Sequence, residues 1–310
     1  MTEYLPEGKR IGTAANIERL SSPRGITEAM ERGEILEARA VMCDSEHNLS
    51  VDLGCMRGFI PREEGAVGIR EGTVRDIAVI SRVGKVVCFV VSDIVTDAKG
   101  RELAILSRAK AQRRCIKEYV ATLSQGDVIR AKVTHLEPFG AFCDIGCGVV
   151  ALMPIDTISV SRIEHPDERF KVGQDIYAVI KSRVDARITL SHKELLGTWE
   201  QNAADFSVGE TVAGVIRSVE NYGAFVELRP NLAGLAELRD NLRVGSAASV
   251  YIKSIIPDRM KIKLIIIDTF EQPPAIEKPR YYITDGHIDR FVYSPKNCEK
   301  IVMTDFRTIV

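Results

Sequence analysis

The sequence contains no long apolar segment. Apolar runs such as Leu264 to Ile267 have the length of a β-strand, and residues 1–32 mix Glu, Lys, Arg, Gly and Pro without an apolar core. A membrane-spanning helix needs about 20 predominantly apolar residues, and a signal peptide needs an apolar stretch of about 7 to 15. We therefore expect no signal peptide and no membrane span, and we predict a cytoplasmic protein.

An excess of positive charge is also missing, since 42 Lys and Arg stand against 43 Asp and Glu for a formal net charge of -1. This balance argues against a histone-like nucleic-acid binder that relies on bulk counterion release. The seven cysteines are an odd number, spread thinly through 310 residues. Free thiols in a reducing compartment fit that pattern better than a disulfide framework does.

Motifs for catalysis and for metal binding are missing as well. Cys143 and Cys147 have no second pair at a fitting distance, and Cys143 should alternate into a barrel interior. His135, His165 and His192 fall at separate positions with no serine or cysteine motif to activate. The glycines sit at strand ends and form no phosphate-binding loop. We expect no catalytic residue, no metal site and no cofactor.

The sequence does contain an internal repeat, which is the first thing to seek in a chain of this length. The clearest copy begins at Gly126 and carries Phe139-Gly140-Ala141-Phe142. A second copy, about 83 residues later, begins at Gly209 and carries Tyr222-Gly223-Ala224-Phe225. A worn copy begins at Gly33 and ends at Leu106-Ser107. Three ordered copies at similar spacing indicate three similar domains.

Each copy predicts about five short strands, because β-branched residues alternate with polar ones and the breaks fall at Gly, Pro, Asn or Asp. The predicted fold is mainly β, with three tandem five-stranded barrels of the oligonucleotide-binding (OB) type joined by helical linkers. We expect a leader over 1–32, a degenerate barrel over 33–108, a helical linker over 109–125, a barrel over 126–192, a helical linker over 193–207, a barrel over 208–269 and a tail over 270–310. The leader should contain a short helix near Ile26 to Arg32, and the tail a small hairpin turned at Asp285-Gly286. Trp199, in the second linker, should pack between barrels.

The aromatic residues of the repeat predict a surface for unstacked bases. Residues three apart in a strand face opposite sides, so Phe139 and Phe142 should diverge. A bulge at Gly140 would insert one residue and bring both rings to one face, and Tyr222 and Phe225 repeat the arrangement. Paired exposed rings suit stacking by single-stranded RNA. A lone motif of this kind is more often strand core, but its repetition favours RNA contact.

Basic residues on the neighbouring strands alternate with Val and Ile, which leaves one side of each strand apolar and the other free for phosphates. Such residues are ordinarily solvated surface, so their role depends on the rings beside them. We expect a local basic patch on an otherwise neutral protein. The candidates are Arg130, Lys132, Lys181, Arg183 and Arg187 in the middle copy, and Arg217, Lys253, Lys261 and Lys263 in the last copy.

At these residues the sequence resembles the S1 domain, an RNA-binding repeat named after the largest protein of the bacterial small ribosomal subunit. The match covers about Gly33 to Asp268, and the order of the copies is similar to that of short ribosomal-protein-S1-like proteins of Firmicutes. The resemblance implies binding of single-stranded RNA or mRNA, association with the 30S subunit and a part in translation. It assigns the RNA-binding aromatics to Phe139, Phe142, Tyr222 and Phe225, and a basic or polar ring to Asp185, Arg187 and Lys261.

The sequence departs from the family pattern at two places. The position often held by His falls on Pro61, Pro154 and Glu237, and in the first copy the aromatic positions fall on His47 and Ser50. The first copy therefore resembles a protein-docking or spacing barrel. An alternative function for the whole chain is a protein-interaction adaptor that docks on the ribosome, RNA polymerase or an RNA-degrading complex. An enzyme is a third class, for which no acidic cluster or metal set appears.

Overall fold

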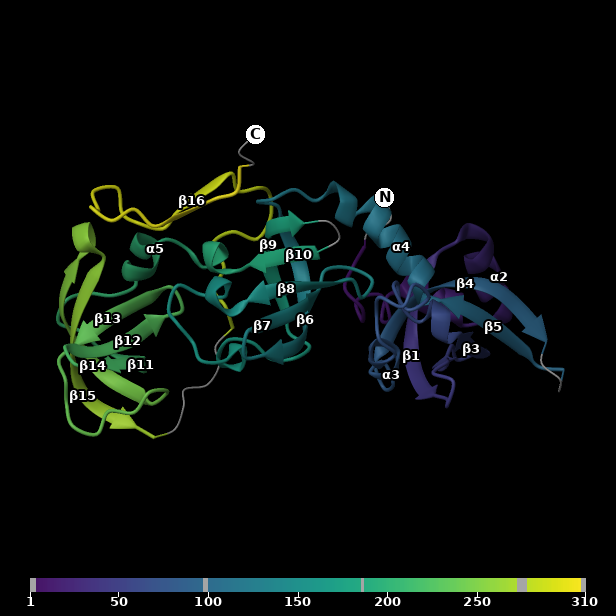
Figure 1. Cartoon of the computed structure of the whole chain (residues 1–310), viewed down its shortest axis with the longest axis horizontal. Helices are drawn as coiled ribbons and strands as arrows, with labels where there is room; N and C mark the ends of the chain where they lie inside the picture. The colour runs from purple at the N-terminus through teal and green to yellow at the C-terminus, as the bar shows by residue number, and fades with distance from the viewer. Residues whose placement is uncertain (1–3, 97–99, 185–186, 272–277, 308–310) are drawn as a thin grey trace. The chain divides into compact units, whose positions relative to one another are not determined.

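A computed structural model describes residues 4–96, 100–184, 187–271 and 278–307, and within them the chain forms three closed β-barrels of five strands each (Figure 1). The predicted class of three tandem OB barrels is confirmed. The chain divides into two compact units. Unit 1 comprises 1–123 and 144–150, and unit 2 comprises 124–143 and 151–310. Within the described ranges, no helix combines the length and the apolar character that crossing a membrane requires.

The first barrel, in unit 1, has the strand order β1-β2-β3-β5-β4. Its interior is filled by large apolar side chains such as Leu49, Ile60, Phe89 and Leu106, all fully buried. The short elements η1 (Arg62–Glu64) and α3 (Ile77–Ile80) lie between β3 and β4. The five strands are β1 (Ile35–Cys43), β2 (Leu49–Asp52), β3 (Arg57–Ile60), β4 (Val86–Thr96) and β5 (Glu102–Ser107).

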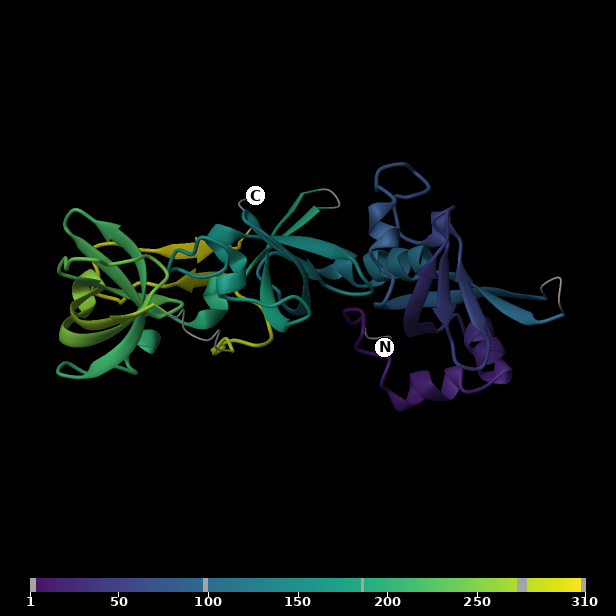
Figure 2. The same ribbon diagram turned by 90° about the horizontal axis from the view of Figure 1, so that it is seen from below.

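The leader is more ordered than expected, since it forms two helices, α1 (Ala14–Leu20) and α2 (Pro23–Arg32), that lie beside the first barrel (Figure 2). The predicted helix near Ile26 begins three residues earlier because Ser22 caps it, accepting from the Gly25 amide at 3.1 Å, and Pro23 occupies its first turn. It ends at Arg32, and Gly33 after it adopts a left-handed conformation with φ of 61°.

The second barrel follows α4 (Arg108–Glu118) and η2 (Val120–Thr122) and has the strand order β10-β8-β7-β6-β9. It closes through a parallel pairing of β8 with β10, where Leu152 lies opposite Thr189. The turns η3 (Ile155–Thr157) and η4 (Pro166–Glu168) lie between β8 and β9. The strands are β6 (Val128–Glu137), β7 (Gly140–Asp144), β8 (Val150–Pro154), β9 (Asp175–Val184) and β10 (Arg187–Ser191).

The third barrel repeats this topology, with a parallel pairing of β13 and β15. Along β15, Ile262, Leu264 and Ile266 are buried, and the residues between them are exposed, which is the alternation of a barrel strand. The turn η6 (Pro257–Arg259) precedes that strand. The strands are β11 (Thr211–Glu220), β12 (Gly223–Arg229), β13 (Leu232–Ala236), β14 (Ala247–Ile256) and β15 (Lys261–Phe270).

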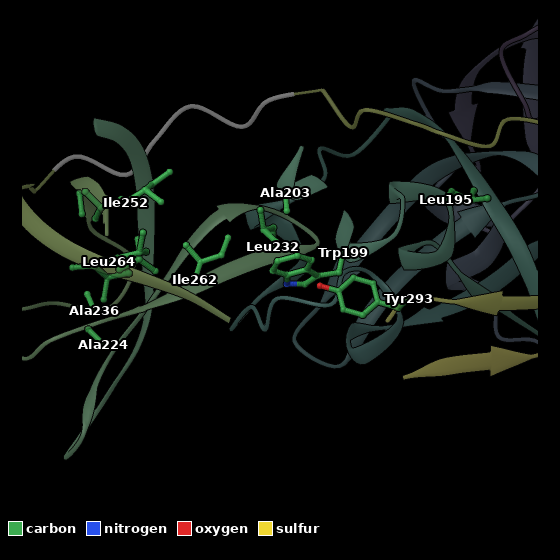
Figure 3. Close-up of a cluster of buried hydrophobic side chains, with 14 of the residues drawn as sticks. Leu195, Trp199, Ala203, Ala224, Leu232, Ala236, Ile252, Ile262, Leu264 and Tyr293 are labelled. Carbon is green, nitrogen blue, oxygen red and sulfur yellow. The ribbon is translucent and has the colours of Figure 1, made fainter. Parts of the chain in front are cut away.

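The segment between these two barrels forms η5 (Lys193–Leu196) and α5 (Trp199–Ala203). Trp199 is buried in a cluster that joins Val179 of the second barrel to Ile216 and Leu232 of the third. Figure 3 shows its indole beside Tyr293. The prediction that Trp199 packs between barrels is confirmed.

The C-terminal tail forms a small hairpin, but the predicted turn at Asp285-Gly286 is wrong. The paired strands are β16 (Arg290–Val292) and β17 (Met303–Asp305). Gly286 instead lies against the second barrel, where its carbonyl accepts from the Val128 amide at 2.9 Å. Further along, the Tyr293 hydroxyl donates to the Asn231 carbonyl of the third barrel at 2.6 Å. The tail therefore packs on both barrels of unit 2.

Candidate nucleic-acid interface

The four predicted rings lie on the outer surfaces of the second and third barrels. Phe139 is 56% exposed and Tyr222 is 65% exposed, while Phe142 and Phe225 are half-buried. In the second barrel the ring centroids lie 5.9 Å apart at an interplanar angle of 89°. In the third they lie 6.3 Å apart, also at 89°. Each pair is a stable edge-to-face contact that still presents ring faces to solvent.

The predicted cause of this arrangement, a bulge at the glycine, is wrong. Phe139 lies in the turn before β7 and not in the strand, so no bulge is needed to bring its ring to the same side as Phe142. In the third barrel the irregular ladder position falls on β11, between Ile216 and Ser218. The glycines are needed for another reason. A Cβ on Gly140 would lie 2.4 Å from the Met153 carbonyl oxygen, so only glycine lets the adjacent strand approach.

A third ring joins the second barrel's pair and was not predicted. His135 of β6 stacks on Phe142 with centroids 6.2 Å apart and planes at 27°, and its side chain is 62% exposed. Its Nε2 lies 2.6 Å from Glu137 Oε1. When β6 and β7 are paired outward from the hairpin turn, residue 135 falls opposite residue 142. The strand register therefore indicates that His135 lies beside Phe142. The equivalent residue of the third barrel is Ser218, opposite Phe225.

Three of the predicted cations lie along the same outer surface as the rings. Leu235 lies opposite both Phe225 and Lys263, which places Lys263 two strands from the ring, about 10 Å away. Lys261 precedes it on the same face. In the second barrel Leu152 lies opposite Thr189 in the same way, and Arg187 precedes Thr189 on that face. Arg187, Lys261 and Lys263 are all exposed.

Two further lysines occupy irregular positions in the next ladders. Lys181 is the extra residue where β9 pairs with β10, and Lys253 is the extra residue where β14 pairs with β15. Lys253 Nζ lies 3.8 Å from Glu237 Oε1. Arg183 lies opposite Ile188 and is exposed. Asp185, assigned to the polar ring by resemblance, lies outside the described residues.

Two predicted cations lie away from the rings. Arg130 and Lys132 belong to the ladder between β6 and β9, opposite Tyr177 and Asp175. They precede His135 by five and three residues, or about 17 and 10 Å along the strand. The structure therefore does not bring them to the aromatic surface.

Arg217 must be removed from the candidate cations. Its side chain is only 9% exposed and donates to both carboxylate oxygens of Glu227, at 2.9 and 3.1 Å, and to Glu168. Arg169 also donates to Glu227. Burial alone would lower the pKa of Arg217, but its hydrogen bonds to Glu227 hold the pKa above the ordinary value. Arg217 therefore belongs to a buried ion-pair network and is not placed to contact phosphate.

Known proteins resemble this chain both in the second barrel and over most of its length. The family model of the S1 RNA-binding domain matches residues 122–193, which include all five strands of the second barrel. The small ribosomal subunit protein bS1 of Staphylococcus aureus strain N315 is 29% identical over 287 residues, covering 87% of this chain and 71% of that protein. The second barrel matches the S1 domain, and the chain is similar to bS1 proteins over most of its length.

Two further matches are a second bS1 protein and a solved structure. The bS1 protein of Staphylococcus haemolyticus is 29% identical over 292 residues, covering 89% of this chain and 72% of that protein. A crystal structure of a multidomain protein with nucleic acid binding domains from Streptococcus pneumoniae covers 76% of this chain and 74% of that one. That structure is 13% identical, with a TM-score of 0.25.

The first barrel lacks the aromatic pair at the equivalent positions, as the worn repeat predicts. Ser50, at the second aromatic position, lies opposite Met42 on β1, which is 54% exposed. His47, at the first, adopts a φ of 65°, and its Nδ1 lies 3.4 Å from Asp76 Oδ2. The positions that family members give to His are held by Pro61 and Pro154 at strand ends and by Glu237, which pairs with Lys253.

Cys143, Cys147 and His192, which were considered above for metal binding or catalysis, are all buried. Cys143 is fully buried in β7, and Cys147 is buried in unit 1, where hydrogen bonds from the Cys115 and Cys88 thiols lower its pKa to about 4. His192 is buried, and desolvation lowers its pKa to about 4. Across the described ranges, no group of three or more His, Cys, Asp or Glu is arranged to hold a metal ion.

Proposed function

We propose that the protein binds single-stranded RNA through the outward rings of its second and third barrels. The observation that carries the proposal is the recurrence of one arrangement. An exposed ring and a half-buried ring meet edge to face at the same turn of both barrels, with exposed cations two strands away. Unpaired bases stack on such rings for about 1 to 3 kcal/mol each, and the cations meet the phosphates.

The rings in this proposal are Phe139, Phe142, Tyr222 and Phe225, with His135 added to the second barrel. The phosphate contacts are Arg187, Lys261 and Lys263, supported by Lys181, Arg183 and Lys253 at the next ladders. Neither group performs chemistry on RNA, so the protein acts as a binder and not as an enzyme.

The similarity to bS1 extends the proposal to the cellular partner. Relatives named as small ribosomal subunit proteins match nearly the whole chain. We infer that this protein works in the cytoplasm, associates with the 30S subunit and holds mRNA during translation. Fold alone does not assign a role, and the sites on the barrels carry the RNA-binding part of the inference.

The experiment that tests RNA binding compares a labelled single-stranded RNA with the same RNA annealed to its complement, by fluorescence anisotropy. Stacking requires unpaired base faces, so the single strand should bind and the duplex should bind far more weakly. Equal affinity for the two forms would show attraction to phosphate alone. The single strand should also stay intact with added magnesium, and its hydrolysis would overturn the non-enzymatic role.

A second candidate function, protein docking, has its own observation in the first barrel. Val41 and Met42 of β1 are each more than half exposed, at ladder positions that Arg217 and Ser218 hold in β11 of the third barrel, and Ile77 of α3 is 64% exposed. An adaptor would use this apolar surface. Co-sedimentation with purified 30S subunits, after free RNA has been digested with ribonuclease, tests this candidate. Met42→Glu should abolish co-sedimentation if the protein is an adaptor, and should leave it unchanged if the association depends on RNA.

A further inference from the structure

A solvent-open pocket of about 420 Å³ lies in unit 1, separate from the proposed RNA-binding rings. Its wall combines three segments: the chain around Arg10 and the start of α1, the junction of α2 with β1, and Arg114 of α4. Three arginines line it, and Glu34 is the only carboxylate among its lining residues in the described part of the chain. The pocket is therefore rich in positive charge.

Arg10 is the most informative of these arginines. Its backbone amide donates to Glu37 Oε2 at 2.8 Å, which fixes the chain at this point. Its side-chain Nε and Nη2 are buried yet meet no acceptor among the described residues. Buried guanidinium donors without an acceptor are unfavourable and uncommon in folded proteins. Because Arg10 lines the pocket, a turn of its side chain towards the pocket would give these donors the oxygens of a bound anion as acceptors.

Carboxylates approach the other two arginines of the pocket only at long range, and Arg114 Nε lies 3.9 Å from Glu118 Oε1. The Glu34 carboxylate already accepts two hydrogen bonds from Arg19, at 2.9 and 3.1 Å. Arg32, which is 63% exposed, approaches that carboxylate only to 3.7 Å. Arg114 donates to the Gly33 carbonyl and keeps a side chain that is 30% exposed.

We propose that this pocket binds a phosphorylated small molecule up to the size of a mononucleotide. Phosphate presents several acceptor oxygens, which the planar forks of two or three guanidinium groups can engage at once. Leu36 and Ala15 also line the pocket and provide apolar surface for the body of the ligand. The volume lies within the range of small-molecule pockets, about 300 to 1,000 Å³, and is too small for a folded partner.

The test uses the full chain and titration calorimetry with pyrophosphate and ADP, with acetate as a plain anion. Pyrophosphate is the decisive probe because it has no base to stack on the rings of unit 2. We expect both phosphorylated probes to bind and acetate not to. Arg32→Gln should weaken pyrophosphate binding about fivefold or more, and Arg10→Met should abolish it.

Arg24→Gln is the matched control, since Arg24 is a 90% exposed arginine of α2 that pairs with Glu28 and does not line the pocket. It should bind pyrophosphate normally. Because Arg10 Nε and Nη2 are buried, the Arg10 variant is read together with a thermal melt. The variant of the exposed Arg32 keeps the test valid if Arg10→Met unfolds. Binding unaffected by Arg32→Gln, equal binding of acetate, or no binding of pyrophosphate would each overturn the proposal without touching RNA binding.

Discussion

Removal of the two half-buried rings, Phe142→Ala with Phe225→Ala, should weaken binding of single-stranded RNA while leaving both barrels folded. Each ring contributes one stacking surface, worth about 1 to 3 kcal/mol. A strand that engages both barrels would therefore lose about 2 to 6 kcal/mol, a loss in affinity of about 30-fold or more. Each single variant should lose about tenfold.

The cost to folding should be small because these rings point outward. Their strand neighbours Ala141, Cys143, Ala224 and Val226 fill the barrel interiors and are untouched. Truncation removes the edge-to-face contact with Phe139 or Tyr222, which is worth about 0.5 to 1.5 kcal/mol. The thermal midpoint should fall by only a few degrees.

The assay is anisotropy of a labelled RNA, with a circular dichroism melt of each variant. Phe270→Ala is the matched control, because Phe270 is a 51% exposed phenylalanine of the third barrel near the far end of β15, opposite Ala247. It should bind as the parent does. An affinity for the double variant within twofold of the parent, with an unchanged melt, would refute stacking on these rings.

Three further predictions concern charge. Lys261→Gln with Lys263→Gln should weaken RNA binding and reduce the slope of log affinity against log salt by about 0.7 for each phosphate that the protein no longer neutralises, measured by a salt titration. Arg217→Gln should leave that slope unchanged but destabilise unit 2 by about 3 kcal/mol in urea, because it breaks the buried pair with Glu227; a changed slope with normal stability would contradict the buried placement. The folded pKa of His192, about 4, lies below its ordinary 6.5, so stability should fall as pH drops from 6.5 towards 4, by up to about 3 kcal/mol, and His192→Gln should flatten that fall.

The sequence predicts the fold and the ring positions well because both depend on local, repeated signals. The alternation of apolar and polar residues and the glycine breaks recur in each copy, so the sequence alone predicts three five-stranded barrels. The position of Phe139 in a turn and the approach of Met153 to Gly140 depend on the neighbouring strand, which a single-strand pattern does not reveal. The rings were therefore placed correctly for an incorrect reason.

Residues whose role depends on distant partners were harder to assign. Arg217 alternates with apolar residues like a surface cation, yet Glu168, 49 residues away, and Glu227 take its donors. Predicting the contact of His135 with Phe142 requires the register of the hairpin between β6 and β7, and the sequence pattern predicts a bulge where the structure has the turn of that hairpin. Gly286 is a favourable turn residue, but pairing with Val128 of the second barrel determines the path of the tail.

Ultraviolet crosslinking of the full chain to single-stranded RNA, followed by mass spectrometry of the attached peptides, tests the RNA-binding surface most directly. We predict crosslinked peptides that contain the turns at Phe139 and Tyr222 of the second and third barrels, with none at Phe270. Crosslinks confined to the first barrel or the tail, with those turns unmodified, would contradict the proposed surface.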